Sequence, residues 1–213
     1  MRESWRWPRR AGATVLLLTA GVGALHLPGA RPWLRRAGGC PVPRATAAQV
    51  EAAEVRAFGR LRGTHVAKAR PALGFGLAIT TRADVEAWAR NHDIACESRR
   101  EGTLLLCQAV PVRTVLPGAG GTYDELAFGF RLRDARLVNL TALRTGLSSG
   151  AAAGEIRRIA ARLEETLGAP SQRIAGDPAI LAYRYSDYLA EVSAMSLRER
   201  GRALREHYMS ALE

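Results

Sequence analysis

The sequence has few of the residues from which catalytic and metal sites are built. Its 213 residues include four histidines and three cysteines, which lie scattered along the chain. Both the CxxC spacing and the accompanying histidines of a zinc site are missing. No other group of residues has the spacing of a nucleophile with its base. The sequence therefore predicts no catalytic residue, no metal and no cofactor.

Lysine is also scarce, because Lys68 stands alone against 30 arginines. The net charge is +11, but residues 1–44 hold eight arginines against one acid, Glu3, a balance of +7. The other 169 residues therefore carry only +4. A nucleic-acid-binding protein concentrates its positive charge on the folded domain. We therefore expect no nucleic-acid partner. We interpret the positive charge as part of an N-terminal targeting segment, together with a general preference for arginine in the composition of the chain.

The longest apolar run covers residues 11–27, after an arginine-rich start. It only borders on the roughly 17 to 25 residues that span a bilayer, and its centre has the length typical of a signal peptide. Residues 1–27 are therefore predicted to be a signal peptide or membrane anchor. Three alternatives stay open: a signal peptide cleaved after Ala24, an uncleaved anchor, or a lipid anchor on Cys40.

A linker is predicted over residues 28–72, whose first part is rich in proline, glycine and arginine. One helix is expected within it, at 47–62, because Thr46 and Gln49 have the spacing of a capping box. Its apolar residues share one face at helical spacing: Val50, Ala53, Ala57, Phe58 and Leu61. The compact domain is then expected over residues 73–213.

Cys96 and Cys107 are equally distant from the Glu101–Gly102 dipeptide, which reads as a turn between two strands. A four-residue loop, Arg100–Thr103, places the cysteines at a non-hydrogen-bonded pair, where side chains approach most closely. The two residues could also be small buried hydrophobic side chains. The symmetry favours a disulfide, which implies an oxidising compartment.

A second hairpin is predicted from an alternating strand at 126–133 and a returning strand at 136–144. A three-residue loop over 133–135 keeps both apolar faces on the same side, whereas a two-residue turn would not. It requires a left-handed residue at or near Ala135. The predicted pairs are Phe130 with Val138, Phe128 with Leu140, and Leu126 with Ala142.

The remaining elements follow from caps and periodicity. We expect a strand at 74–79, a helix capped by Thr81 and ending at Asn91, and a helix at 151–167. A hairpin is expected over 180–194, and a final helix over 197–212, with a strand as its alternative. The resulting fold class is α+β: an antiparallel sheet of hairpins with two main helices packed on one face, preceded by the N-terminal segment and linker.

One group of side chains is a candidate binding surface: Tyr183, Arg184, Tyr185 and Tyr188. Tyrosine and arginine are enriched at binding hot spots. The alternative is that the tyrosines cover the sheet core, because their spacing gives one inward face.

The order of elements resembles the small α+β domains of the outer-membrane assembly lipoprotein and β-lactamase-inhibitor-like type. The features that carry the resemblance are a strand ending at Thr80–Thr81, a helix with Asp84–Val85, antiparallel strands, and a helix closing with Leu167-Gly168-Ala169-Pro170. The resemblance covers residues 73–194 in outline, and it implies a non-catalytic envelope protein that binds other proteins. We therefore expect an exported or envelope-associated domain, periplasmic or membrane-anchored, that binds a protein or envelope component. Its contact with the membrane would be through the N-terminal segment, if that is uncleaved. The alternative is an exported enzyme whose active site is not recognisable from sequence.

Overall fold

The computed structural model describes residues 45–197 and 201–211. The predicted signal or anchor segment 1–27, the first part of the linker and Cys40 lie outside the described residues. In the part of the chain that is described, no helix is both long and apolar enough to cross a membrane.

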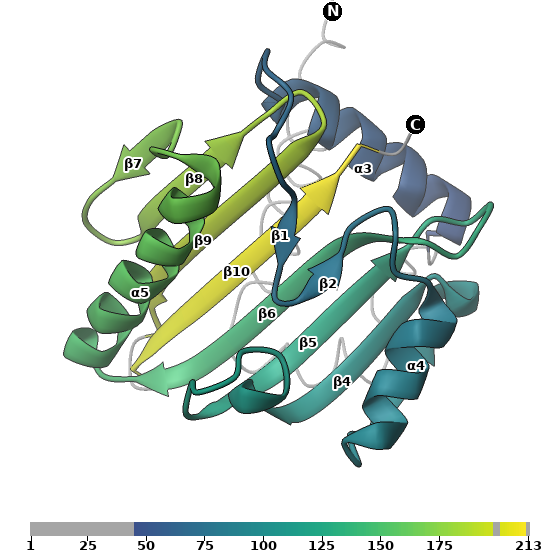
Figure 1. Ribbon diagram of the computed structural model, residues 1–213, viewed down its shortest axis with the longest axis horizontal. Coiled ribbons are helices and arrows are strands. Elements are labelled where there is room, and N and C mark those ends of the chain that lie inside the picture. Colours follow the sequence, from purple (N-terminus) through teal and green to yellow (C-terminus); the bar gives the residue numbers. More distant parts are fainter. Residues whose placement is uncertain (1–44, 198–200, 212–213) are drawn as a thin grey trace, which may run out of the picture. The chain divides into compact units, whose positions relative to one another are not determined.

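The described chain forms an eight-stranded antiparallel sheet, a small two-stranded sheet and three α-helices (Figure 1). The helices are α3 (Ala47–Leu61), α4 (Arg82–Asn91) and α5 (Ser149–Leu167), with short 3-10 turns η1 (Arg100–Gly102) and η2 (Val112–Thr114). The strands of the large sheet are β3 (Cys96–Arg99), β4 (Leu104–Pro111), β5 (Thr122–Phe130), β6 (Leu137–Leu147), β7 (Gln172–Ile174), β8 (Ala179–Arg184), β9 (Tyr188–Ser196) and β10 (Arg202–Ser210). The small sheet pairs β1 (Pro71–Ala72) with β2 (Phe75–Gly76).

The large sheet is made of two similar halves. In each half a helix is followed by a four-stranded meander, α4 by β3–β6 and α5 by β7–β10. The strand order β3-β4-β5-β6-β10-β9-β8-β7 joins the halves through their last strands. The predicted α+β class with an antiparallel sheet is confirmed.

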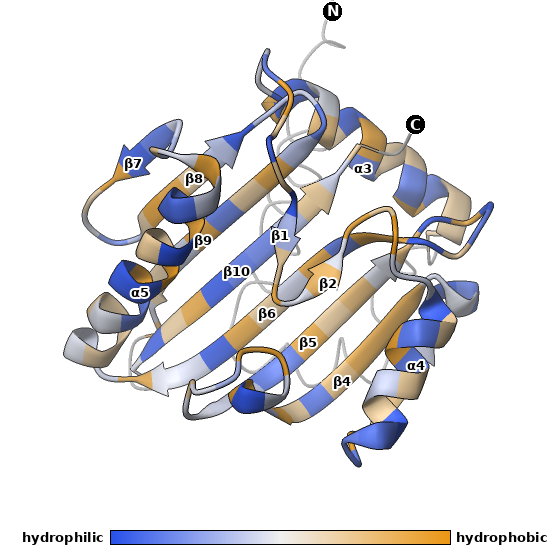
Figure 2. Cartoon of the chain, in the orientation of Figure 1, coloured by the Kyte–Doolittle hydropathy of each residue, from blue (hydrophilic) through white to orange (hydrophobic). Residues whose placement is uncertain are grey.

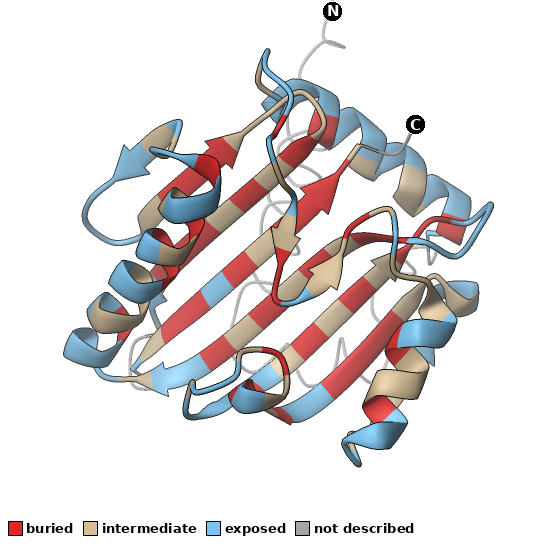
Figure 3. Cartoon of the chain, in the orientation of Figure 1, coloured by how far each residue is buried: buried red, intermediate tan, exposed pale blue. Residues whose placement is uncertain are grey.

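One face of the sheet, the front face, is apolar and carries α4, α5 and the small sheet (Figure 1). Along the central strands, buried residues alternate with partly exposed ones (Figure 3), and hydrophobic residues with hydrophilic ones (Figure 2). From α4, Trp88 lies 5.8 Å from Phe128 between ring centroids. From α5, Ile159 and Leu163 are buried in the same core. Burial of this face is the main favourable term for folding.

Helix α4 begins where the sequence predicts, and α5 begins at Ser149, two residues before the predicted start. Thr81 and Asp84 form a capping box at α4, and the Ser148 hydroxyl accepts a hydrogen bond from the Ala151 N–H at the start of α5. These caps satisfy N–H groups that the first helical turn leaves unpaired. At the other end of α5, Gly168 has a φ of 82°, a conformation that glycine adopts readily.

The hairpin registers agree closely with the sequence predictions. Leu126 pairs with Ala142 and Phe128 with Leu140, and Ala135 has the expected left-handed φ of 54°. Phe130 pairs with Leu137 instead of Val138, because a bulge between Gly129 and Phe130 shifts the register by one residue. The hairpin expected over 180–194 is also present, with Leu181 paired with Val192 and Tyr183 with Ala190.

The expected helix over 197–212 is wrong, because residues 202–210 form strand β10. Gly201 just before it has a φ of 74°, and its position cannot take a side chain: a Cβ would lie 2.8 Å from the Leu147 carbonyl oxygen. Strand β10 occupies the centre of the sheet between β6 and β9.

Two boundaries also differ from expectation. The strand predicted at 74–79 is mostly turn, since Leu73, Gly74 and Ala78 have positive φ values, and only the short β1–β2 pair forms. The compact unit begins at Ala45 and not near residue 73. The segment after α3 is part of the fold, because the Ala67 N–H donates to Asp187 at 2.8 Å and Tyr188 donates to the Pro71 carbonyl at 2.6 Å.

Candidate functional site

A cavity of about 430 Å³ lies between α3 and the sheet face opposite the core, the back face. Its walls are the first turns of α3, the turn between β3 and β4, and residues of β4, β5 and β6. The polar residues in these walls are Glu51, Glu54, Arg99, Arg100, Thr103, Glu125, Asn139 and Thr141. The strand residues among them alternate with the buried side chains of the front face, so the sheet period directs them away from the core.

Helix α3 turns its glutamates toward the sheet. Ala47 and Phe58 are buried at 3% and 5% exposure, and Glu51 and Glu54 lie between them at helical spacing. The predicted apolar face is therefore only partly correct: Phe58 is buried and Val50 lines the cavity. The other three predicted members are exposed: Ala53, Ala57 and Leu61.

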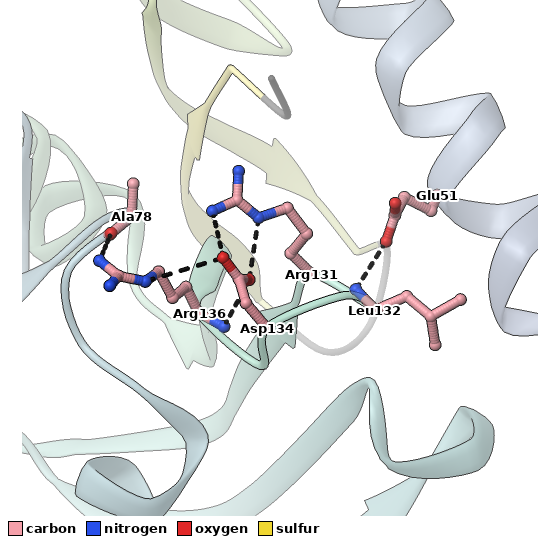
Figure 4. Close-up of polar contacts among 6 residues, drawn as sticks. All are labelled: Glu51, Ala78, Arg131, Leu132, Asp134 and Arg136. Atoms are coloured by element: carbon pink, nitrogen blue, oxygen red, sulfur yellow. Dashed lines mark hydrogen bonds and ion pairs between the residues drawn. The ribbon is translucent and has the colours of Figure 1, made fainter.

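Glu51 attaches α3 to the β5–β6 turn, because its Oε2 accepts the Leu132 N–H at 2.8 Å (Figure 4). The turn is held by Asp134, whose carboxylate accepts hydrogen bonds from Arg131 at 2.9 and 2.6 Å. Arg136 forms an ion pair with the same carboxylate at 3.7 Å and donates to the Ala78 carbonyl at 2.9 Å (Figure 4). Side chains from α3 and the β5–β6 turn, together with the Ala78 carbonyl, therefore hold this turn against the first half of α3.

The carboxyl group of Glu54 is partly buried in the cavity wall. Burial raises its pKa above the ordinary value, while Arg100 and a hydrogen bond with the Asn139 side chain act in the opposite direction. Desolvation disfavours the ionised form of a carboxyl group, and here nearby charge compensates for only part of that cost.

The opposite wall carries two guanidinium groups. Arg99 donates to Glu97 at 2.7 Å, and this bond raises the pKa of Arg99. Arg100 is close enough to Glu54 to lower the pKa of that acid. The cavity thus presents three carboxyl groups, two guanidinium groups and the hydrogen-bonding groups of Thr103, Asn139 and Thr141. Such a set can bind a polar group that carries both kinds of charge.

Within the described residues, the cavity walls contain no cysteine, serine or histidine, and no cluster of three potential metal ligands occurs.

A second polar cluster lies under α5 on the front face. Glu206, 2% exposed, accepts hydrogen bonds from Tyr123 at 2.9 Å, from Arg162 at 2.8 Å and from Tyr208. Burial raises the pKa of Tyr123 and of Tyr208, and the Glu206 charge raises both further. Only Arg162 keeps appreciable contact with solvent, at 33% side-chain exposure. This cluster is closed to a ligand and joins α5 to β5 and β10.

The tyrosine group predicted as a binding surface is mostly core. Tyr183 and Tyr188 are fully buried, because both project from the front face of the sheet. Tyr185 is partly buried and donates to the Leu167 carbonyl at 2.6 Å, and Arg184 donates to Gln172 at 2.7 Å. The alternative interpretation, tyrosines that cover the sheet core, describes Tyr183 and Tyr188 correctly.

The predicted disulfide is present. Cys96 and Cys107 are cross-strand partners with a Cα–Cα distance of 4.1 Å, bonded across the four-residue loop 100–103. The close Cα approach is that of a non-hydrogen-bonded pair, as expected. A buried disulfide is typical of proteins in oxidising, exported environments.

No family model, no curated protein and no solved structure matches this chain. The resemblance to small envelope domains therefore stays a prediction.

The cavity could not be found from the sequence. The capping box at Thr46 located α3, and its glutamates were visible at positions 51 and 54. Tertiary contacts, such as that of Glu51 with Leu132, determine which side of the helix faces the sheet. The local periodicity of the sequence gives no information on these contacts.

Proposed function

We propose that this chain is an exported, envelope-associated and non-catalytic domain that binds a polar segment of another protein in the cavity between α3 and the back face. The observation that carries the proposal is the orientation of α3. A helix that only completes a fold buries its apolar stripe. Here two glutamates face the sheet, while Ala53 and Ala57 of the same helix are exposed.

The size and chemistry of the cavity support a binding role. Ligand sites usually have volumes of about 300–1,000 Å³, and this cavity of about 430 Å³ is within that range. Glu54 is partly desolvated and has a raised pKa, which is a feature of functional clefts. A basic side chain of the partner beside Glu54 would supply the missing compensation, and Arg99 and Arg100 would bind carbonyl or carboxylate oxygens.

The disulfide supports the exported part of the proposal, since such bonds persist outside the reducing cytoplasm. The periplasmic or membrane-anchored location rests on the sequence of residues 1–44 alone.

The proposal is tested by filling the cavity. Ala127 lies in the cavity wall on β5, so Ala127→Phe should occupy the space without changing any charge. Ala48 is exposed on α3, so Ala48→Phe is the matched control. Each full-length variant is used to capture partners from the detergent-solubilised envelope fraction.

We expect wild type and Ala48→Phe to retain the same protein, and Ala127→Phe to lose it. Equal capture by all three proteins would contradict the proposal, provided that the variants melt cooperatively.

A further inference from the structure

One end of the sheet, which we call the α3 end, gathers the β3–β4, β5–β6 and β8–β9 turns. The antiparallel pairing places these turns together, and β10 ends beside them. Helix α3 joins this end through Glu51, which accepts the Leu132 N–H at 2.8 Å. Just after the helix, the Gly63 N–H donates to the Tyr185 carbonyl at 3.0 Å. The loop after α3, residues 62–70, therefore lies at the same end.

Exposed apolar side chains are concentrated at the α3 end. Seven large hydrophobic residues of the described chain are exposed, and five of them belong to this end. They are Val55 at 46%, Leu61 at 44%, Val66 at 70%, Ile79 at 73% and Leu132 at 50%. Ile79 belongs here because its neighbours Ala78 and Thr80 bond Leu137, at the start of β6. Single exposed apolar residues are ordinary, whereas a concentration marks an interaction surface.

The second half of α3 and the loop after it are basic. Residues 55–70 contain five basic residues and no acid: Arg56, Arg60, Arg62, Lys68 and Arg70. All five are exposed. Among the described ion pairs only Arg70 has an acidic partner, Asp187, at 2.6 Å. In the β5–β6 turn, Arg133 and Arg136 are exposed, whereas Arg131 is buried and paired with Asp134.

We propose that the α3 end docks on an anionic membrane surface. Basic side chains of residues 55–70 would contact lipid phosphates, and Val66 and Leu61 would enter the headgroup region. Interfacial binding uses this combination of exposed aliphatic and basic residues. Single-stranded nucleic acid is commonly bound by stacking on Phe, Tyr and Trp rings, and the one such residue of this stretch, Phe58, is buried. This inference does not require the cavity to be occupied.

The test uses the full chain on vesicles, and the readout is backbone hydrogen exchange of residues 62–70. Total vesicle binding is not used, because it would also report lipid contact by residues 1–44. Vesicles of phosphatidylcholine alone are compared with vesicles that also contain phosphatidylglycerol. The test variant is Arg60→Gln with Arg62→Gln and Lys68→Gln. The control, Arg90→Gln with Arg113→Gln and Arg157→Gln, removes the same charge from exposed positions elsewhere.

We expect anionic vesicles to slow exchange over 62–70 in wild type and in the control, and high salt to abolish the effect. The test variant should dock about two orders of magnitude more weakly and lose the protection. Val66→Ser should reduce the protection with no change in charge. Equal exchange on neutral and anionic vesicles, or equal loss in test and control variants, would overturn the proposal. Protection that appears only when envelope proteins are added would identify a protein partner instead.

Discussion

At the residue scale, Glu206 explains both a stabilising contact and an error of sequence interpretation. Leu204, Tyr208 and Leu212 are four residues apart, a spacing that fits a helical face and also one face of a strand. The position that distinguishes the two patterns is 206, where a core strand would show an apolar residue. A glutamate at this position interrupts the apolar alternation of a core strand. Its hydrogen-bond partners Tyr123 and Arg162 are distant in sequence, so local pattern does not show that Glu206 can be buried.

Replacing Glu206 with Ala should destabilise the domain by about 3 kcal/mol, near the lower end for breaking a buried ion pair, because Arg162 keeps a third of its surface in solvent. Glu206→Gln, which preserves shape and some hydrogen bonds, should cost less. Urea denaturation measures both. If Glu206→Ala and Glu206→Gln both unfold at the wild-type midpoint, the cluster contributes nothing to stability.

His207, on the back face of β10, should make the domain sensitive to acid. Burial, assisted by the Arg205 charge, lowers its pKa to about 4, although Glu191 acts in the opposite direction. In the unfolded chain the group binds a proton below about pH 6.5. Stability is therefore expected to fall as the pH decreases from about 6.5 to about 4. The urea midpoint of His207→Gln should vary less over this interval, and an unchanged slope would refute the assignment.

At the scale of single elements, the hairpins were predictable because their information is local. The spacing of Cys96 and Cys107 about one dipeptide, and the alternation through residues 126–133, determine register within a few residues of a turn. The bulge at Gly129–Phe130 was not predictable, because it depends on how the turn meets residues 78–82 through bonds such as Arg82 N–H to the Ala135 carbonyl.

Ala135 offers a direct test of this turn, because its φ of 54° is strained for any residue with a Cβ. Ala135→Gly should stabilise the domain by about 0.5–1 kcal/mol, since relief of strain exceeds the added entropy of the unfolded chain. Ala153→Gly, at an exposed position of α5, should instead destabilise by about 1 kcal/mol. Thermal melting compares them, and a loss of stability in Ala135→Gly would contradict the strained conformation.

Helix α5 should depend on its buried stripe. Leu163 is fully buried, and Leu163→Ala is expected to cost about 2–5 kcal/mol through lost burial and a residual cavity. Thr166, on the exposed side of the same helix, gives the control Thr166→Ala, expected within about 0.5 kcal/mol of wild type. An unchanged melting temperature for Leu163→Ala would mean that the stripe is not core.

The disulfide should form in the cell and contribute modestly to stability. Cys96 and Cys107 are 11 residues apart, so the double alanine variant should lose about 2–3 kcal/mol. Thiol labelling of unreduced, denatured protein from the envelope should spare both residues and modify Cys40 where it is retained. Labelling of Cys96 and Cys107 would show that the bond is absent in the cell.

At the scale of the whole molecule, the sequence predicts the class of fold but not the extent of the domain. Periodicity and caps locate the front face and its helices. The start at Ala45, the central place of β10 and the cavity depend on contacts between segments far apart in sequence, such as Ala67 with Asp187. The candidate site was missed for the same reason, since its walls come from α3 and four strands.

The binding role of the cavity is tested most directly by photo-crosslinking in intact cells. A photoreactive amino acid is placed at Thr103, in the cavity wall, or at Thr166, exposed on α5. We predict one discrete protein adduct from position 103, none from position 166, and loss of the adduct when Ala127→Phe fills the cavity. The same adducts from both positions, or an adduct from 103 that persists with Ala127→Phe, would contradict a binding site under α3.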